Sequence, residues 1–236
     1  MQVIRLTASG LRRFDSVAIE PSPGLNLITG DNGAGKTSVL EALHLLAYGR
    51  RFRGRVRDGL VRSGADAVEV FVEWQEGEEC RHRRAGLRHT GQTWVGRLDG
   101  QTVAQLGELC AALAVVSFEP GSHALVTGGG EPRRRFVDWG LFHVEPAFLS
   151  LWRRYARALK QRNALLKSGA GEQQLDAWDH ELAEAGEPLT RHRRQYLEQL
   201  QLRLLKVAAE LVPGLGASSL EFQPGWRSGE FSLADA

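Results

Sequence analysis

The sequence has little cysteine and no long hydrophobic run. Its 236 residues include only two cysteines, Cys80 and Cys110, which stand far apart and outside any Cys/His cluster. This usage argues against a disulfide framework and against a zinc site, and it suits a reducing compartment. No apolar stretch approaches the roughly 20 residues that span a bilayer, and the N-terminus lacks the apolar core of a signal peptide. We therefore expect a cytoplasmic protein without a membrane segment.

The chain also lacks a large excess of charge of one sign. Its formal net charge is +2 and its pI is about 8.7, too mild by itself to indicate a nucleic-acid binder. The arginines are nevertheless unevenly distributed, and the densest segment runs from Arg50 to Arg62 with only Asp58 as an opposing charge. Arginines in such a segment could bind phosphates. They could equally lie in a solvated loop and pair with acids such as Glu69 and Glu73.

The N-terminal half alternates between strand and helix patterns. Residues 2–8 and 14–20 are predicted strands, joined by a turn at Ser9-Gly10 with Leu11. A third predicted strand at 25–29 enters a glycine-rich loop, and residues 37–48 have the apolar spacing of a helix. Three further segments, 67–75, 79–88 and 93–98, are predicted to form an antiparallel set. A weak helix at 101–111 and a buried strand at 113–116 complete this half.

From about residue 132 the sequence becomes long, charged and amphipathic. Helices are predicted at 146–167 and 173–211, with one break at 168–171 and another near Gly186-Glu187-Pro188. The simplest arrangement of these helices is an antiparallel hairpin. We expect an α/β fold in which residues 1–120 form a P-loop ATP-binding domain with an antiparallel β patch, and residues 121–236 form an α-helical arm.

The glycine-rich loop, residues 30–37, fits the pattern G-x-x-x-x-G-K-[ST] between a predicted strand and a predicted helix. Glycines let backbone N–H groups curl around the β-phosphate of a nucleotide, and the helix N-terminus adds partial positive charge. Lys36 is placed to neutralise the β- and γ-phosphates, the Thr37 hydroxyl to bind Mg²⁺, and Ser38 to reach the α-phosphate. The alternative is an ordinary glycine turn with Lys36 and Thr37 on the surface. The predicted ATP-binding residues are Gly30, Asp31, Asn32, Gly33, Ala34, Gly35, Lys36, Thr37 and Ser38.

The loop and its surroundings resemble the ABC-type ATPases of DNA repair, and within them the bacterial RecF family. The resemblance rests on Leu11-Arg12-Arg13-Phe14, on Gly24 to Ala42, and on four later segments. These four are Asp58-Gly59-Leu60-Val61-Arg62-Ser63-Gly64, Glu131-Pro132-Arg133-Arg134-Arg135-Phe136-Val137-Asp138, Tyr155 to Lys167 (YARALKQRNALLK) and Asp176 to Gly186 (DAWDHELAEAG). They occur in the family's order, and together the matches extend from residue 2 to about residue 212.

The resemblance implies an ATP- and Mg²⁺-dependent protein that binds gapped or single-stranded DNA, assists recombinase loading and takes part in the SOS response. It implies an ATP-bridged homodimer and the recombination mediator RecR as partners, and no membrane partner. It also favours DNA contacts by the arginine-rich segment, with the candidate residues Arg50, Arg51, Arg53, Arg55 and Arg57.

The sequence departs from the family in one respect. Relatives carry a signature helix and a Walker B strand beyond the point at which this chain stops, so we expect a fragment that binds ATP and is poorly suited to hydrolyse it. Neither Leu125 to Glu131 nor Val115 to Glu119 is expected to replace these elements. The alternatives are an ATPase subunit of a transporter and an SMC-like head. A transporter subunit would be expected to have an in-chain signature and Walker B strand, and an SMC-like head a long coiled coil.

Overall fold

A computed structural model describes residues 1–50, 59–169, 171–212, 214, 219–226 and 232–234. The chain forms two compact units, Met1–Phe118 and Glu119–Ala236, and each is described by itself. Both cysteines are free; Cys80 is exposed and Cys110 is buried. None of the described helices combines the length and apolarity needed to cross a bilayer.

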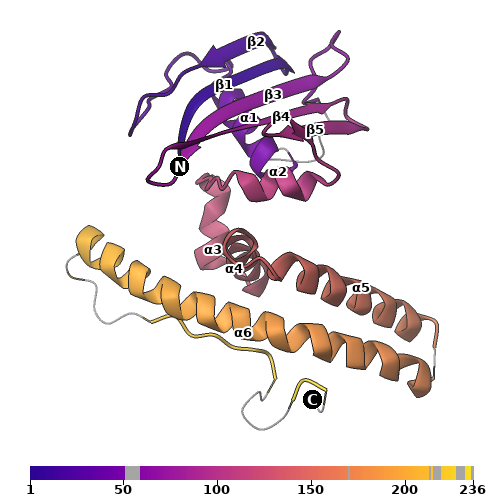
Figure 1. Ribbon diagram of the computed structural model, residues 1–236. Coiled ribbons are helices and arrows are strands. Elements are labelled where there is room, and N and C mark those ends of the chain that lie inside the picture. The colour runs from indigo at the N-terminus through magenta and orange to yellow at the C-terminus, as the bar shows by residue number, and fades with distance from the viewer. Residues whose placement is uncertain (51–58, 170, 213, 215–218, 227–231, 235–236) are drawn as a thin grey trace. The chain divides into compact units, whose positions relative to one another are not determined.

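The first unit is a six-stranded antiparallel sheet with helices on one face (Figure 1). The strands follow the spatial order β2-β1-β3-β4-β5-β6. Their bounds are β1 Gln2–Leu11, β2 Phe14–Ile19, β3 Val68–Glu76, β4 Arg81–His89, β5 Trp94–Leu98 and β6 Gln101–Thr102. The helices are α1 Lys36–Tyr48 and α2 Leu106–Ala112. The antiparallel patch predicted from the sequence is therefore confirmed, and the predicted helix at 101–111 is shorter and is preceded by β6.

Alternation of apolar side chains along the strands explains why one face of this sheet is covered. In β3, Val68, Val70, Val72 and Trp74 are each at most 2% exposed, whereas the residues between them lie on the other face. Side chains of α1 and α2 complete the same core. Successive strand residues point to opposite faces, so a period of two places one full set of apolar residues against the helices.

The turn between β1 and β2 differs from the prediction. The structure places it at Arg12 and Arg13, so that Leu11 pairs with Phe14, and not at Ser9-Gly10. Gly10 has a φ of +62° within β1, and a Cβ there would lie 2.2 Å from the Ala67 carbonyl oxygen. This glycine therefore serves the close approach of another backbone segment and not a turn.

Two strands predicted from apolar runs are wrong. Residues 25–29 and 113–116 have no strand structure. Leu25 is 96% exposed and Leu27 is 84% exposed, whereas Leu113 is buried although its segment forms no ladder. A strand is defined by a neighbour that satisfies its backbone groups, and among the described residues no strand lies beside either segment.

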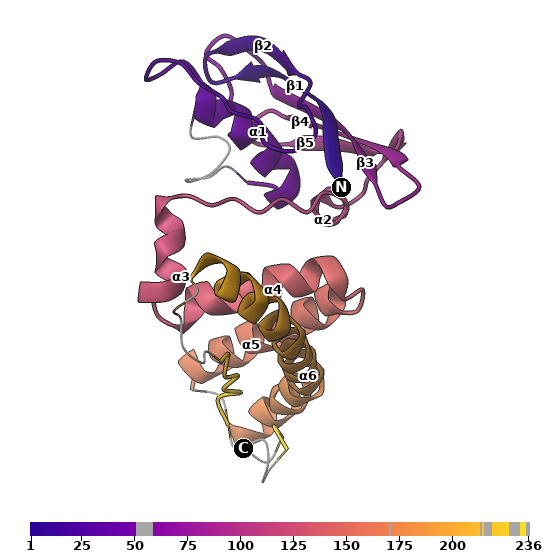
Figure 2. The same ribbon diagram turned by 90° about the vertical axis from the view of Figure 1, so that its left-hand side faces the viewer.

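The second unit is entirely helical in its regular structure (Figure 2). Its elements are the short 3₁₀ turn η1 Pro120–His123 and the helices α3 Ala124–Thr127, α4 Gly130–Val144, α5 Phe148–Lys167 and α6 Glu172–Leu211. Helices α5 and α6 run antiparallel as the predicted hairpin (Figure 1). A small core joins α4, α5 and α6 through Val137, Leu141, Phe148 and Leu189.

The predicted break near Pro188 is wrong, because α6 continues through it. A proline inside a helix costs about 3 kcal/mol through a lost hydrogen bond and a steric clash. Ala185 and Leu189 on either side of Pro188 are at most 1% exposed, and complete burial of one leucine side chain contributes roughly 1.5–3 kcal/mol. Tertiary packing thus offsets the local cost. The other predicted break is confirmed, since α5 ends at Lys167 and α6 begins at Glu172.

Candidate phosphate-binding site

The glycine-rich loop has the backbone geometry that its sequence predicts. Gly30, Gly33 and Gly35 have φ values of +141°, +84° and +100°, which side chains other than glycine rarely adopt. The loop ends at Gly35, the N-cap of α1, which forms no side-chain cap. The first turn of α1 also holds no acidic residue, so the positive end of its dipole faces the loop without a competing carboxylate.

Lys36 closes the loop from its end to its beginning. Its ammonium donates hydrogen bonds to the carbonyl oxygens of Gly30 at 2.7 Å and Asp31 at 2.8 Å. An ammonium held over the loop backbone is a positive charge already positioned beside the N–H groups that would face a phosphate. Thr37 is exposed at the start of the helix, and Ser38 is 8% exposed.

The residues present fit the phosphates of a nucleotide better than they fit a protein-built metal centre. Among the described residues, no group of three or more His, Cys, Asp or Glu side chains is arranged to hold a metal ion. Mg²⁺ in a phosphate loop takes few of its ligands from the protein and the others from phosphate and water. The Thr37 hydroxyl is the metal ligand that this loop offers. The bound ion would neutralise phosphate charge.

Three consecutive residues at the β1–β2 turn contact the glycine-rich loop and α1. Arg12 donates to the Glu41 carboxylate on α1 through Nε at 2.5 Å and Nη2 at 3.1 Å. Arg13 Nη1 lies 3.4 Å from the Gly33 carbonyl oxygen, and a Cβ on Gly35 would lie 2.4 Å from Phe14 Cζ. These contacts fix the start of α1 against the sheet.

The Arg12–Glu41 pair was not foreseen from the sequence. Glu41 is only 1% exposed although it carries a carboxylate, and its hydrogen bonds raise the pKa of Arg12. The two residues are 29 positions apart, so no local spacing reveals the pair. The available signal is an acidic residue among the apolar positions of α1, because an acid in such a place requires a partner.

His44 is a second buried polar group that the sequence did not single out. Its ring stacks on Tyr48 with centroids 4.2 Å apart, and its Nδ1 lies 3.4 Å from Ser117 Oγ. Burial, with a smaller contribution from the charge of Arg50, lowers the pKa of His44 to about 4. Tyr48 donates a hydrogen bond to the Val115 carbonyl oxygen at 2.8 Å. His44 is therefore neutral near pH 7 and helps to hold residues 115–117 along α1.

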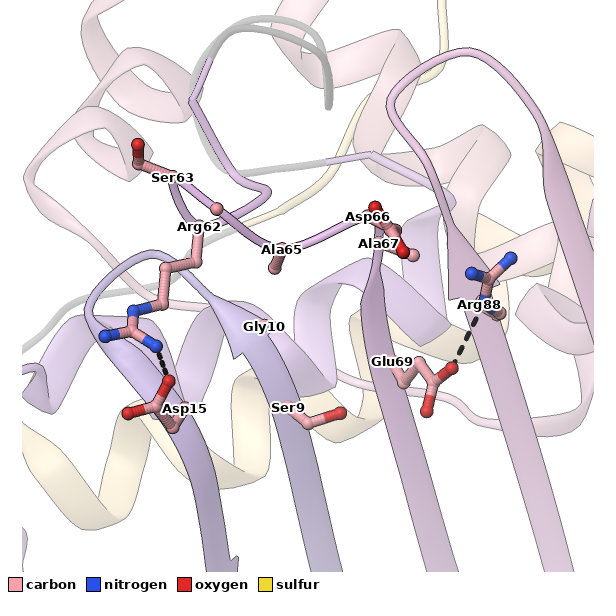
Figure 3. A pocket seen from close by; sticks show the side chains of 11 residues that line it. Ser9, Gly10, Asp15, Arg62, Ser63, Ala65, Asp66, Ala67, Glu69 and Arg88 are labelled. Carbon is pink, nitrogen blue, oxygen red and sulfur yellow. Dashed lines mark hydrogen bonds and ion pairs between the residues drawn. The ribbon is translucent and has the colours of Figure 1, made fainter.

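The predicted DNA-binding arginines lie mostly outside the described residues. Arg50 is described and exposed at the end of the α1 segment, whereas Arg51, Arg53, Arg55 and Arg57 are not among the described residues. The downstream end of this segment lines a polar hollow of about 400 Å³ with β1 and β3 (Figure 3). In this hollow Arg62 forms an ion pair with Asp15, and Arg88 pairs with Glu69 at 3.1 Å. Both cations are thus already compensated by acids.

The arginines at the start of α4 are also paired. Arg134 and Arg135 contact Glu131 at 3.1 and 2.8 Å. They follow Glu131 by three and four residues, the spacing expected for exposed pairs on a helix. Arg133 instead donates to the carbonyl oxygens of residues 125 and 126, at 3.1 and 2.9 Å. Asp138, further along α4, accepts two hydrogen bonds from Arg193 on α6 at 2.7 and 2.9 Å.

Comparisons with known proteins agree with this architecture. Residues 5–104 match the family described as AAA domain. The chain is 71% identical over 240 residues to the "DNA replication and repair protein RecF" of Stenotrophomonas maltophilia, and 70% identical over 239 residues to that of Xanthomonas euvesicatoria. Both matches cover 100% of this chain, and they cover 66% and 65% of the relatives. The chain thus spans about two thirds of their length.

Solved structures give the same fold. A structure named "Structure of the recombination mediator protein RecF-ATPrS in RecFOR pathway" aligns with a TM-score of 0.80 and 26% identity, covering 89% of this chain and 58% of that one. An Smc head domain derived from Pyrococcus furiosus aligns with a TM-score of 0.52 and 18% identity, covering 90% of this chain and 66% of that one. The fold is therefore that of the ABC-type ATPase heads of RecF and Smc proteins. By its sequence identity over the whole chain, this protein belongs to the RecF family.

Proposed function

We propose that this chain binds ATP through residues 30–38 and supplies the phosphate-binding part of a RecF-type DNA replication and repair protein. The observation that carries the proposal is the loop itself. Three glycines with positive φ, an uncapped helix N-terminus and the Lys36 ammonium converge on one short segment. These are the donors and charges that recognise a triphosphate, and the solved RecF structure with 26% identity is named for a nucleotide complex.

Mg²⁺ is the proposed cofactor beside ATP. The Thr37 hydroxyl is the ligand from this chain, and Ser38 follows it towards the α-phosphate. The bound ion would supply charge neutralisation at the β- and γ-phosphates. The chain's own contribution is to orient the phosphates through backbone N–H groups and Lys36.

The partners proposed for the whole protein follow from the family. They are single-stranded or gapped DNA, a second copy joined through ATP, and the recombination mediator RecR, with assistance to recombinase loading and SOS induction as the outcome and the cytoplasm as the location. For DNA contact the candidates remain Arg50, Arg51, Arg53, Arg55 and Arg57, which fit phosphate recognition by residue type.

ATP binding is tested by titrating the full chain with a fluorescent ATP analogue in the presence of Mg²⁺. Lys36→Ala removes a charged hydrogen-bond donor, for which a loss of about 10–100-fold in affinity is expected. Lys206→Ala, an exposed lysine on α6, is the matched control and should bind like the wild type. Equal affinity of Lys36→Ala and the control would overturn the assignment of the loop.

DNA binding is tested with a gapped duplex and an intact duplex, each with and without ATP. Replacing the five candidate arginines with glutamine should lower the slope of log affinity against log salt by about 0.9 for each lost phosphate contact in duplex DNA. An unchanged slope would remove the arginine-rich segment from the interface. Gapped-DNA binding that never responds to ATP would contradict the proposed coupling.

A further inference from the structure

Helix α5 has an unusual charge composition. Its 20 residues contain six Lys or Arg and no Asp or Glu. Two of the six cations reach back to α6: Arg154 contacts Glu181 at 2.5 and 2.8 Å, and Arg162 contacts Asp179. Glu181 and Asp179 of α6 are thus already paired, and the remaining cations of α5 are on its exposed surface.

Three of these exposed cations form a regular column. Arg153, Lys160 and Lys167 follow one another at intervals of seven residues, and all three are exposed. Among the described residues none forms an ion pair with Lys160 or Lys167. An interval of seven residues is almost two helical turns, so the three side chains line one side of α5.

A column of large apolar side chains runs beside the cations with the same interval. Trp152 is 42% exposed, Leu159 is 38% exposed and Leu166 is 47% exposed. Ala156 and Asn163 fall between them, so the spacing along this column alternates between four and three residues. This alternation is that of the d and a positions of a coiled-coil seam, and the cations occupy the neighbouring e positions.

The side of α5 that contacts α6 is a different one. Ala158 is fully buried, and Tyr155 packs within the small core of this unit. Successive residues of a helix are about 100° apart around its axis, so Ala158 and Leu159 lie on different sides, and the Arg154 and Arg162 pairs mark the side of Ala158 as the one that faces α6. The apolar column is therefore a second helix-packing face, and α6 leaves its large side chains partly exposed.

We propose that this face, Trp152, Ala156, Leu159, Asn163 and Leu166 with its basic edge, is a docking seam for an acidic amphipathic helix of a partner protein. The apolar column would pack against leucine-like side chains of the partner, and the basic edge would face its Glu or Asp residues. A polar Asn at an a position costs stability and fixes register, which suits a specific partner.

Charge complementarity and the apolar column together select this occupant. Nucleic-acid phosphates would satisfy the cations, but they offer no counterpart to a row of Trp and Leu side chains. A second copy of α5 would oppose cations with cations, and like charges across a seam are destabilising. The seam spans 14 residue steps, roughly 21 Å of helix, which matches a short docking helix and not an extended coiled coil.

The test uses the full chain and a synthetic fluorescent peptide of about two heptads, with Leu at a and d except for one Asn at a, and Glu at e and g. A second peptide carries Lys in place of every Glu. We expect the wild type to bind the acidic peptide and not the basic one. The triple variant Arg153→Glu, Lys160→Glu, Lys167→Glu should weaken the acidic peptide at least about tenfold and gain the basic one. This exchange of preference is a result that a merely structural role would not produce.

Two further variants separate packing from charge. Leu159→Asp should lose the acidic peptide without gaining the basic one, whereas Lys206→Glu, on α6, should bind both peptides as the wild type does. Circular dichroism and ATP-analogue binding should stay at wild-type values in all variants, because the seam is exposed and lies in the other unit from the loop.

Four results would overturn the proposal. The first is failure of the wild type to bind the acidic peptide. The second is binding that survives both the charge reversal and Leu159→Asp. In the third, a duplex oligonucleotide binds the wild type but not the triple variant while the peptide does not bind at all; this would make the face a nucleic-acid surface. A dimer that Leu159→Asp dissociates, without peptide binding, would assign the face to a second copy.

Discussion

The ion pair between Arg12 and Glu41 gives the sharpest prediction about stability. Arg12→Met removes both donors, at 2.5 and 3.1 Å, from a carboxylate that is 1% exposed. Breaking a fully buried pair by removing one partner costs about 3–5 kcal/mol, because the remaining buried charge loses the hydrogen bonds of that partner. The Arg12 side chain is 36% exposed and water screens part of the interaction, so we expect a loss of about 2–3 kcal/mol.

Removing both charges should cost less than removing one. The double variant Arg12→Met, Glu41→Leu leaves no buried charge, and replacing an ion pair with apolar side chains is often close to neutral. We expect the double variant to recover most of the loss, a coupling of at least about 1 kcal/mol. Arg13→Met is the control, since its one contact, at 3.4 Å to the Gly33 carbonyl oxygen, is long and exposed. It should stay within about 0.5 kcal/mol of the wild type.

The free energies of unfolding are measured by urea titration of the full chain. Because the chain has two compact units, hydrogen exchange of the amides in residues 36–48 is measured as well, so that the loss is assigned to α1. The reasoning is refuted if Arg12→Met matches the Arg13→Met control. It is also refuted if the double variant is as unstable as Arg12→Met, because the cost would then not arise from the loss of the Arg12 hydrogen bonds to the Glu41 carboxylate.

Three other predictions concern backbone and titration. Gly35→Ala should destabilise the first unit and abolish ATP-analogue binding, because position 35 has a φ of +100° and a Cβ there would lie 2.4 Å from Phe14. Gly24→Ala is the control: position 24 has a φ of +85° and no atom within 4 Å of a Cβ, so this variant should show only the milder cost of backbone strain. Pro188→Ala should raise the free energy of unfolding of the helical unit by about 1–3 kcal/mol, and with it the urea midpoint, because it restores a helical N–H. A lower midpoint would show that the proline is required for packing. Burial lowers the pKa of His44 to about 4 in the folded state, so the unfolded state binds the proton more readily. The free energy of unfolding should therefore fall as the pH drops from about 6.5 towards 4. His44→Gln should flatten this part of the pH profile of stability, and an unchanged profile would contradict the burial argument.

The sequence predicted those elements whose formation depends on local pattern. The apolar spacing of α1, the alternation in β3 and the turn that separates α5 from α6 each appear within a window of a few residues, and all three are present in the structure. The loop pattern likewise specifies its own glycine conformations, because the φ values that it needs are set residue by residue.

The errors arise where structure depends on contacts far along the chain. Residues 25–29 have the composition of a strand, but strand formation requires a neighbour, and composition carries no information about one. The helix through Pro188 has the opposite cause, since burial of Leu189 and its neighbours outweighs a local penalty. Local propensity therefore failed for two reasons: residues 25–29 have no neighbouring strand among the described residues, and buried contacts around Pro188 stabilise a helix that propensity disfavours.

The same distinction explains why residues 11–14 accompany a phosphate loop that begins 16 positions later. From the sequence, Leu11-Arg12-Arg13-Phe14 is only a segment shared with a family. In the structure, its last three residues contact Glu41, Gly33 and Gly35 in turn, and so connect the β1–β2 turn with the loop and with α1. A loop whose glycines allow many conformations gains affinity for phosphate when a neighbouring element restricts it to one. We therefore infer that the turn would hold this permissive backbone in the conformation that a bound triphosphate requires.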